Sequence, residues 1–202
     1  MVRALVAKPF EGARSFADWG YGVSLNVGAR WRDFPVSVGL GLDAMSFPES
    51  HGSLDVQLGD SRQSLEETRS DQAVLLGPWF HFAPPRWTFR PYVEGTVSLA
   101  LLNTRYSLAL ASGDGVTSAV TDQAWAFGGG FGLGLEVLLA RASDGSGAGV
   151  FASLGYRKQW GSNASFTRAP DLSSADKTLS FDVPINTSLF FLGVTVQGPV
   201  QR

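Results

Sequence analysis

Apolar and polar residues alternate one by one along most of the chain. Between residues 18 and 31 every second side chain is apolar or aromatic, and the positions between them hold Asp, Gly, Ser, Asn and Arg. A period of two residues is typical of a β-strand, whose side chains point alternately to the two faces of a sheet. The stretch therefore predicts a strand of about thirteen residues, longer than most strands of globular proteins.

The same alternation predicts further strands toward the C-terminus. They cover residues 34–44, 74–82, 89–101, 125–139, 150–160 and 179–191. At 190–196 adjacent apolar residues make the phase ambiguous and predict a β-bulge. Residues 2–10 alternate poorly, yet they are the segment available for an eighth strand, and a truncated N-terminus would account for the weak pattern.

The connections between these strands fall into two kinds. Short connections lie near Asp33, Pro84 and Ser143. They alternate with long polar connections at residues 48–70, 107–121 and 163–177. Short turns at one end and long loops at the other are typical of outer-membrane barrels, which place the short turns on the periplasmic side. With the first strand included, both termini would lie at the periplasmic end.

The composition of the two strand faces separates a membrane barrel from a soluble one. The polar face is mostly Gly, Ser, Ala and Asn, which would make a poor water-exposed surface but fits a narrow lumen. Aromatic residues near the strand ends predict the girdles at the membrane interfaces: Trp19, Tyr21, Trp31, Trp125, Tyr156 and Trp160. We therefore expect an all-β, closed, antiparallel up-and-down transmembrane β-barrel of about eight strands. It forms a single domain over residues 1–202, in which residues 1–17 hold the uncertain first strand and a loop.

Composition and charge exclude several other classes. A net charge of −2 and 17% charged residues do not predict nucleic-acid binding. The absence of cysteine excludes disulfide scaffolds, thiolate metal sites and cysteine catalysis. No run of residues approaches the roughly 18 apolar residues of a membrane-spanning helix.

The girdled alternation, the connection pattern and the glycine-rich stretch 128–135 resemble the small outer-membrane β-barrels of the OmpA/OmpX type. The resemblance is architectural and covers residues 18–198. It implies a Gram-negative cell envelope, contact with the lipid bilayer and lipopolysaccharide, and recognition by the outer-membrane assembly machinery; we expect a monomer. Members of that family commonly end in an aromatic residue, whereas this chain ends in Arg202 and carries Phe190 and Phe191 in its last predicted strand.

The parity of the strands predicts which charged residues face the lumen. These are Arg30, Asp43, Glu94, Glu136, Arg157 and Asp182. Because an unpaired charge away from bulk water costs several kcal/mol, we expect these residues to form a network that fills the lumen. From their approximate positions along the barrel axis, we expect Glu94 to pair with Arg157 and Glu136 to pair with Arg30. A polar path for ions or small solutes is the alternative.

Catalytic and cofactor sites are not expected. The two histidines, His51 and His81, are far apart in the sequence and cannot form a His-rich metal site by themselves. The stretch 39–44 matches a dinucleotide fingerprint, but it continues a strand and does not open a helix. Lys158 has lipid-facing parity beside Trp160, where it could extend toward the interface or meet a lipid phosphate; the former is the simpler expectation.

We therefore expect a structural or surface-interaction role through the external loops, without enzymatic activity, metal or cofactor. A small porin-like pore or carrier is the first alternative. A soluble, lipocalin-like barrel that binds a ligand is the second, and a lipid-modifying barrel enzyme that uses a histidine is the third.

Overall fold

Ten β-strands account for nearly all of the chain that the computed structural model describes, namely residues 1–10, 19–30, 34–58, 61–85, 87–110, 116–143, 148–168, 179–184 and 186–198. They are β1 (Val2–Pro9), β2 (Gly20–Arg30), β3 (Val36–Leu58), β4 (Ser61–Phe82), β5 (Phe89–Leu110), β6 (Val116–Arg141), β7 (Gly149–Gly161), β8 (Asn163–Arg168), β9 (Leu179–Pro184) and β10 (Thr187–Gln197). No described segment is a helix of the length and apolarity needed to cross a bilayer.

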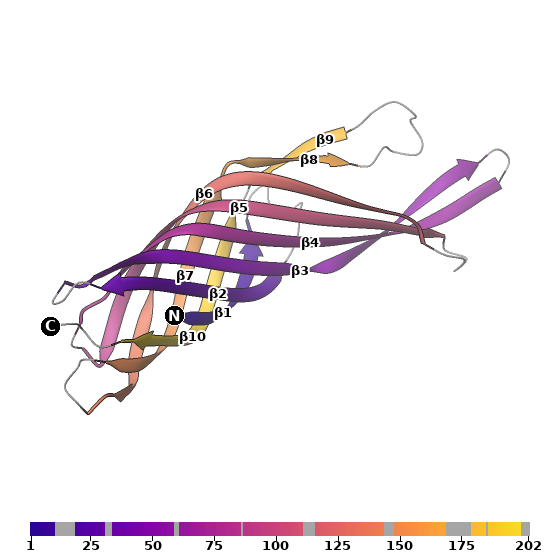
Figure 1. Ribbon diagram of the computed structural model, residues 1–202. Helices are drawn as coiled ribbons and strands as arrows, with labels where there is room; N and C mark the ends of the chain where they lie inside the picture. The colour runs from indigo at the N-terminus through magenta and orange to yellow at the C-terminus, as the bar shows by residue number, and fades with distance from the viewer. Residues whose placement is uncertain are drawn as a thin grey trace.

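Eight of the strands close into an antiparallel barrel in the order β1-β10-β7-β6-β5-β4-β3-β2 (Figure 1). The predicted closed eight-stranded barrel is confirmed. The segment with the weakest sequence pattern closes it, because β1 pairs with β10 from Val2 to Pro9 and with β2 from Val2 to Ala7. Closure leaves no barrel strand with a free edge, so each backbone group of the wall can find a partner within the wall.

The barrel wall is apolar outside, and most of its charged side chains point inside. Leu40, Leu133 and Leu154 on its outer face are 61%, 57% and 62% exposed. Arg3, Glu94 and Arg157 are inside it and at most 2% exposed, since β-strand side chains alternate between the two faces. This distribution is the reverse of the one found in water-soluble barrels, whose apolar side chains point inward.

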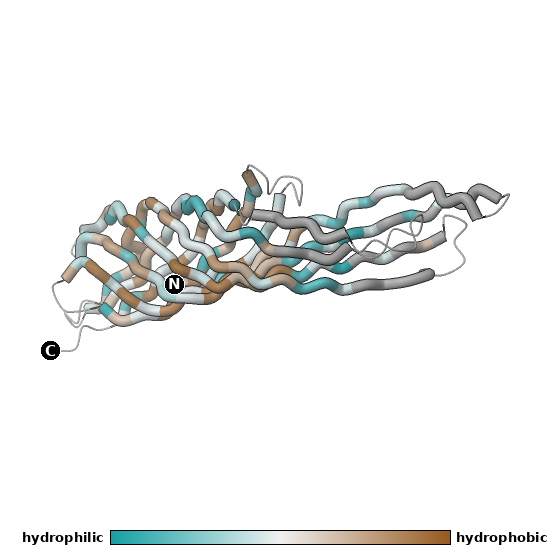
Figure 2. The backbone as a smooth tube through the Cα atoms, turned by 90° about the horizontal axis from the view of Figure 1, so that it is seen from above, coloured by the Kyte–Doolittle hydropathy of each residue, from teal (hydrophilic) through white to brown (hydrophobic). Residues whose placement is uncertain are grey.

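Four strands continue far beyond the barrel. β3, β4, β5 and β6 have 23, 22, 22 and 26 residues, about twice the number in β2 or β10. β2 pairs with β3 only up to Ser46, whose partner is Tyr21. Beyond the row Phe47, Asp71, Thr104 and Asp122, which are in register, the four strands form what we name the protruding sheet. Figures 1 and 2 show it extending away from the barrel, and its described positions are mostly hydrophilic.

The segments 48–70 and 107–121, predicted as long polar connections, are in large part β-strands. Residues 50–58 and 61–69 pair as strands, and so do 104–108 and 118–122. Leu54, Val56 and Leu58 do alternate with polar residues, but 48–53 and 59–64 contain no large apolar residue, so the period is too short to predict a long strand. The register shifts between Phe47 and Ser50, next to Pro48, which cannot donate a backbone hydrogen bond.

The last predicted strand, 179–191, is two strands. β9 ends at Pro184 and pairs with β8 in a separate two-stranded sheet, and β10 alone joins the barrel. Within β10 the register with β7 is continuous from Thr187 to Gln197, so the bulge predicted at 190–196 is absent there. Leu189 and Phe191, predicted to face lipid, are buried inside the barrel.

We refer to the end of the barrel from which the protruding sheet extends as the loop end, and to the opposite end as the turn end. Ala83, Pro84 and Ser143 lie at the turn end, as their short connections predicted. The connection near Asp33 falls outside the described residues.

Candidate functional site: the barrel lumen and the rim at the loop end

Two ion pairs cross the lumen between opposite walls. Arg3 on β1 donates to Glu94 on β5, with 2.9 Å between Nη1 and Oε2. Arg157 on β7 binds Asp43 on β3. In the barrel order, β1 and β5 are diametrically opposite, and so are β7 and β3. The two pairs therefore brace the barrel along two different diameters.

The two crossing pairs are joined at Glu94. Arg157 Nη1 lies 3.6 Å from Glu94 Oε1, and Trp79 Nε1 donates to Glu94 Oε2 at 3.3 Å. All of these side chains are buried. Glu94 Oε2 accepts hydrogen bonds from Arg3 and Trp79, and the nearby charge of Arg157 adds a Coulombic attraction, so much of the cost of burying this carboxylate is offset.

Phe191 separates this charged layer from the rest of the lumen. Its ring centroid lies 4.1 Å from Arg3 Cζ and 4.8 Å from Arg157 Cζ. An aromatic face stabilises a guanidinium group that has left water. This contact explains why Phe191, an apolar residue of β10, points inward. The sequence alone could not show which face of β10 points inward, because apolar residues lie on both of its faces.

A second polar group closes the lumen nearer the turn end. Arg90 on β5 binds Glu136 on β6 and donates to Gln197 on β10 at 2.9 Å. Thr195, also on β10, donates to Glu136 Oε1 at 2.8 Å. Arg30 donates to the carbonyl of Ala83 at 2.7 Å and so lies at the mouth of the barrel. This group ties three parts of the wall together across the opening.

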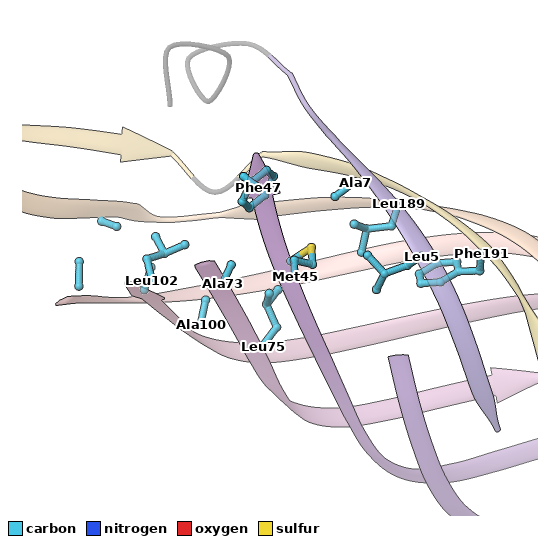
Figure 3. Packing of buried hydrophobic residues seen from close by; sticks show 13 residues of the cluster. Leu5, Ala7, Met45, Phe47, Ala73, Leu75, Ala100, Leu102, Leu189 and Phe191 are labelled. Carbon is cyan, nitrogen blue, oxygen red and sulfur yellow. The ribbon is translucent and has the colours of Figure 1, made fainter. Parts of the chain in front are cut away.

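The lumen nearer the loop end is apolar instead. Small and medium apolar side chains from β1, β3, β4, β5, β6, β8 and β10 pack there (Figure 3). They are Leu5, Ala7, Met45, Phe47, Ala73, Leu75, Ala100, Leu102, Ala124, Ala126, Ala164, Leu189 and Phe191. This part of the lumen therefore offers water and ions few polar partners.

Glycines in the wall make room for the large side chains inside. A Cβ added at Gly155 would collide with the hydroxyl of Tyr92, which itself lies 3.4 Å from Arg3 Nη1. At Gly95, by contrast, the nearest atom to an added Cβ is the carbonyl oxygen of Gly130 at 3.8 Å. Some glycines of the strands, such as Gly155, are therefore required because a larger residue would collide with side chains inside the lumen.

Replacing Gly155 by alanine should lower the free energy of unfolding by about 1–3 kcal/mol, because Tyr92 must move within a filled lumen. Gly95→Ala should change it by less than about 0.5 kcal/mol. Urea unfolding in detergent micelles measures both. Equal effects of the two substitutions would show that Tyr92 does not occupy the space beside Gly155.

The structure brings five of the six predicted lumen charges to the barrel interior or its mouth. Glu94 and Arg157 lie together as the sequence argument paired them. The pairing of Glu136 with Arg30 is wrong, since Arg90 is the ion partner of Glu136. Asp182 is on β9, outside the closed barrel, because the chain leaves the wall before β10 begins.

Several interior residues were not singled out from the sequence, among them Arg3, Arg90, Tyr92 and His81. Arg90 and Tyr92 share the parity of Glu94 and could have been found from it. Arg3 was hidden by the poor alternation of its strand. His81 stacks between Trp79 and Tyr92, with ring centroids 5.3 and 4.9 Å away, and its Nε2 lies 3.7 Å from Glu136.

Eight exposed aromatic side chains form two bands near the ends of the outer face, and Phe80, Phe127, Phe131 and Phe190 are exposed on it outside these bands. At the loop end are Trp19, Tyr21, Trp125 and Trp160, and at the turn end are Phe34, Phe82, Trp87 and Phe89. Tyr156 is half-buried, with its ring 5.1 Å from that of Phe190. Trp31, predicted for the turn-end girdle, lies outside the described residues.

The two histidines lie apart from each other. His51 is on the protruding sheet beside Thr68, whereas His81 is inside the barrel. No cluster of three or more potential metal ligands occurs in the part of the chain that is described.

The lumen therefore combines a cross-braced charged layer with an apolar layer, inside a wall whose outer face is apolar. No protein-family model matches the chain, and no curated protein matches it.

Proposed function

We propose that the protein is a bacterial outer-membrane β-barrel whose lumen is closed and whose protruding sheet serves surface interactions. The observation that carries the proposal is the inverted wall, with large apolar side chains outside and ion pairs inside. Only a solvent as apolar as a lipid bilayer makes such a wall favourable. The two bands of exposed aromatic residues have the character of the girdles at membrane interfaces.

The protruding sheet supports the interaction role. A strand crosses the membrane with about 9–11 residues, whereas β3 to β6 are at least twice as long, so about half of each would stand outside the bilayer. Beyond Ser46, β3 pairs with β4 on one side and has no described strand on the other. A free edge of this kind can accept an extended segment of another protein by β-augmentation.

The apolar face also argues against the soluble, ligand-binding alternative. In such a barrel the apolar residues would line the ligand cavity, and charged residues would cover the outside. Here the ion pairs Arg3–Glu94 and Arg157–Asp43 occupy the interior instead. A soluble barrel would also leave Leu40 and Leu154 in water without a partner.

Cysteine labelling tests the proposal, and the chain is suited to it because it contains no cysteine. Ser53→Cys places a thiol on an exposed position of the protruding sheet, and Leu154→Cys places one on the barrel wall, where the side chain is 62% exposed. In lipid vesicles a membrane-impermeant maleimide should label Ser53→Cys rapidly and Leu154→Cys only after unfolding. Equal labelling of both variants would contradict a membrane-embedded wall.

A small pore is the second candidate, and one observation favours it. Within the lumen, Arg3 Nε and Nη2 and Arg157 Nε and Nη1 have no hydrogen-bond partner in the described part of the chain. Donors of this kind could line a hydrated path for anions. Single-channel recording in planar bilayers separates the candidates: a closed lumen gives no stable conductance steps, whereas a pore gives steps that change when Arg157 is replaced.

A further inference from the structure

Two lysines lie close together on the outer face of the barrel at the loop end. In the strand register Lys8 on β1 pairs with Ser188 on β10, and Ser188 pairs with Lys158 on β7. The three residues thus form a row across neighbouring strands. Because adjacent strands are about 4.8 Å apart, the Cα atoms of the two lysines are separated by about 10 Å, within joint reach of one anionic group.

The position of this row is unusual for charged residues. Lys8 and Lys158 are the charged residues among the described outward-facing positions that lie within the two aromatic bands or between them. Both lie at the loop end, level with exposed Trp19 and Trp160. Membrane interfaces hold aromatic residues at the depth of the lipid headgroups, so both ammonium groups would lie at that depth.

The surroundings hold both lysines in place without neutralising them. Lys8 Nζ lies 4.6 Å from the centroid of the Trp19 ring. Lys158 Nζ lies 4.3 Å from the Phe10 ring and 5.4 Å from the Trp160 ring. No described carboxylate forms an ion pair with either lysine. Aromatic faces orient ammonium groups but leave their charge available to an anion.

Hydroxyl groups complete the row. Tyr156 Oη and Ser188 Oγ lie 3.1 Å apart and share one hydrogen bond, so one of the two hydroxyl protons remains. Neither hydroxyl forms another hydrogen bond among the described residues. Two cations flanking a free O–H donor match the needs of a phosphate group, which accepts several charge-assisted hydrogen bonds.

We propose that Lys8, Lys158 and the Tyr156–Ser188 pair bind the phosphate of a lipid headgroup in the leaflet at the loop end. The proposal rests on the membrane location proposed above. In an outer membrane oriented with its short turns in the periplasm, this leaflet is the external one, and the ligand is a phosphorylated glycolipid. Simple extension of each lysine toward water would require neither the shared register nor the hydroxyl donor between them.

Native mass spectrometry of the detergent-refolded protein tests the site, with diphosphoryl lipid A and its dephosphorylated form as probes. The unmodified protein should retain the diphosphoryl lipid and bind the dephosphorylated one weakly. K8Q and K158Q should each weaken binding about fivefold, and the double variant about thirtyfold, since each interfacial cation contributes about 1 kcal/mol.

The matched control is the double variant R105Q/R141Q, which removes the same charge from exposed positions on the protruding sheet and at the turn end. It should bind as the unmodified protein does. An equal loss in the control, or no loss in K8Q/K158Q, would overturn the site. Displacement of the lipid by inorganic phosphate at equal concentration would overturn the assignment to a lipid. The same samples are also run on a gel, boiled and unboiled. Because only a folded barrel gives a heat-dependent shift, a sample that shifts but has lost lipid binding has lost the site, whereas absence of the shift in the unmodified protein contradicts the membrane proposal.

Discussion

Replacing Glu94 by alanine should destabilise the folded barrel by about 3–5 kcal/mol, the cost of leaving buried charges without a partner. Glu94 joins the two ion pairs that cross the lumen, so its loss leaves Arg3 without its carboxylate and Arg157 with Asp43 alone. Both arginines are at most 1% exposed and cannot turn to water. Glu94→Gln should cost less, since its side-chain amide oxygen can still accept from Arg3 and Trp79.

Urea unfolding in micelles, followed by tryptophan fluorescence, measures these changes in the free energy of unfolding. The control is Glu49→Ala, which removes a carboxylate from an exposed position of the protruding sheet and should change stability by less than about 0.5 kcal/mol. A loss for Glu94→Ala no greater than that of the control would mean that the crossing pairs do not hold the barrel together.

Leu154→Arg should destabilise the barrel by about 2–4 kcal/mol in lipid vesicles, because it places a guanidinium group near the middle of the wall that we propose faces lipid. Leu154 lies near the centre of β7 and is paired with Leu135 and Leu192, which are also exposed. If the outer face were in water, an exposed Leu→Arg change would be nearly neutral.

Two controls show whether the loss of stability in Leu154→Arg comes from placing a charge in lipid. Leu154→Ala removes apolar surface without adding charge, and Ser53→Arg adds the same charge to the protruding sheet. Both should cost much less than Leu154→Arg when unfolding is measured in vesicles. If Leu154→Arg and Ser53→Arg proved equally mild, the outer face would not be in contact with lipid.

The sequence was sufficient for the barrel because one physical constraint acts on every wall strand. A wall between an apolar solvent and a narrow polar interior forces alternation, and 20–30 shows it as plainly as any segment. The constraint ends where the wall ends. In the protruding sheet the alternation is confined to short stretches such as 54–58, between segments without large apolar residues, so strands such as 50–58 were predicted to be connections.

The interior was harder to predict than the wall. Parity placed Glu94 and Arg157 inside, but the partner of Glu136 depends on strand tilt and height, which parity does not give. Phe191 was misplaced because apolar residues stand on both faces of β10, and its inward position depends on two arginines that are far away in sequence. Lys8 and Lys158 become neighbours only through β10, which no local pattern could show.

Refolding into detergent micelles, followed by gel electrophoresis of boiled and unboiled samples, tests the central claim most directly. A closed barrel whose backbone hydrogen bonds are all satisfied within the wall resists dodecyl sulfate until it is heated. The account predicts two bands of different mobility, with conversion to the unfolded band only on boiling. A single mobility in both samples, together with solubility in plain buffer, would contradict it and would mean that the apolar face is not a membrane surface.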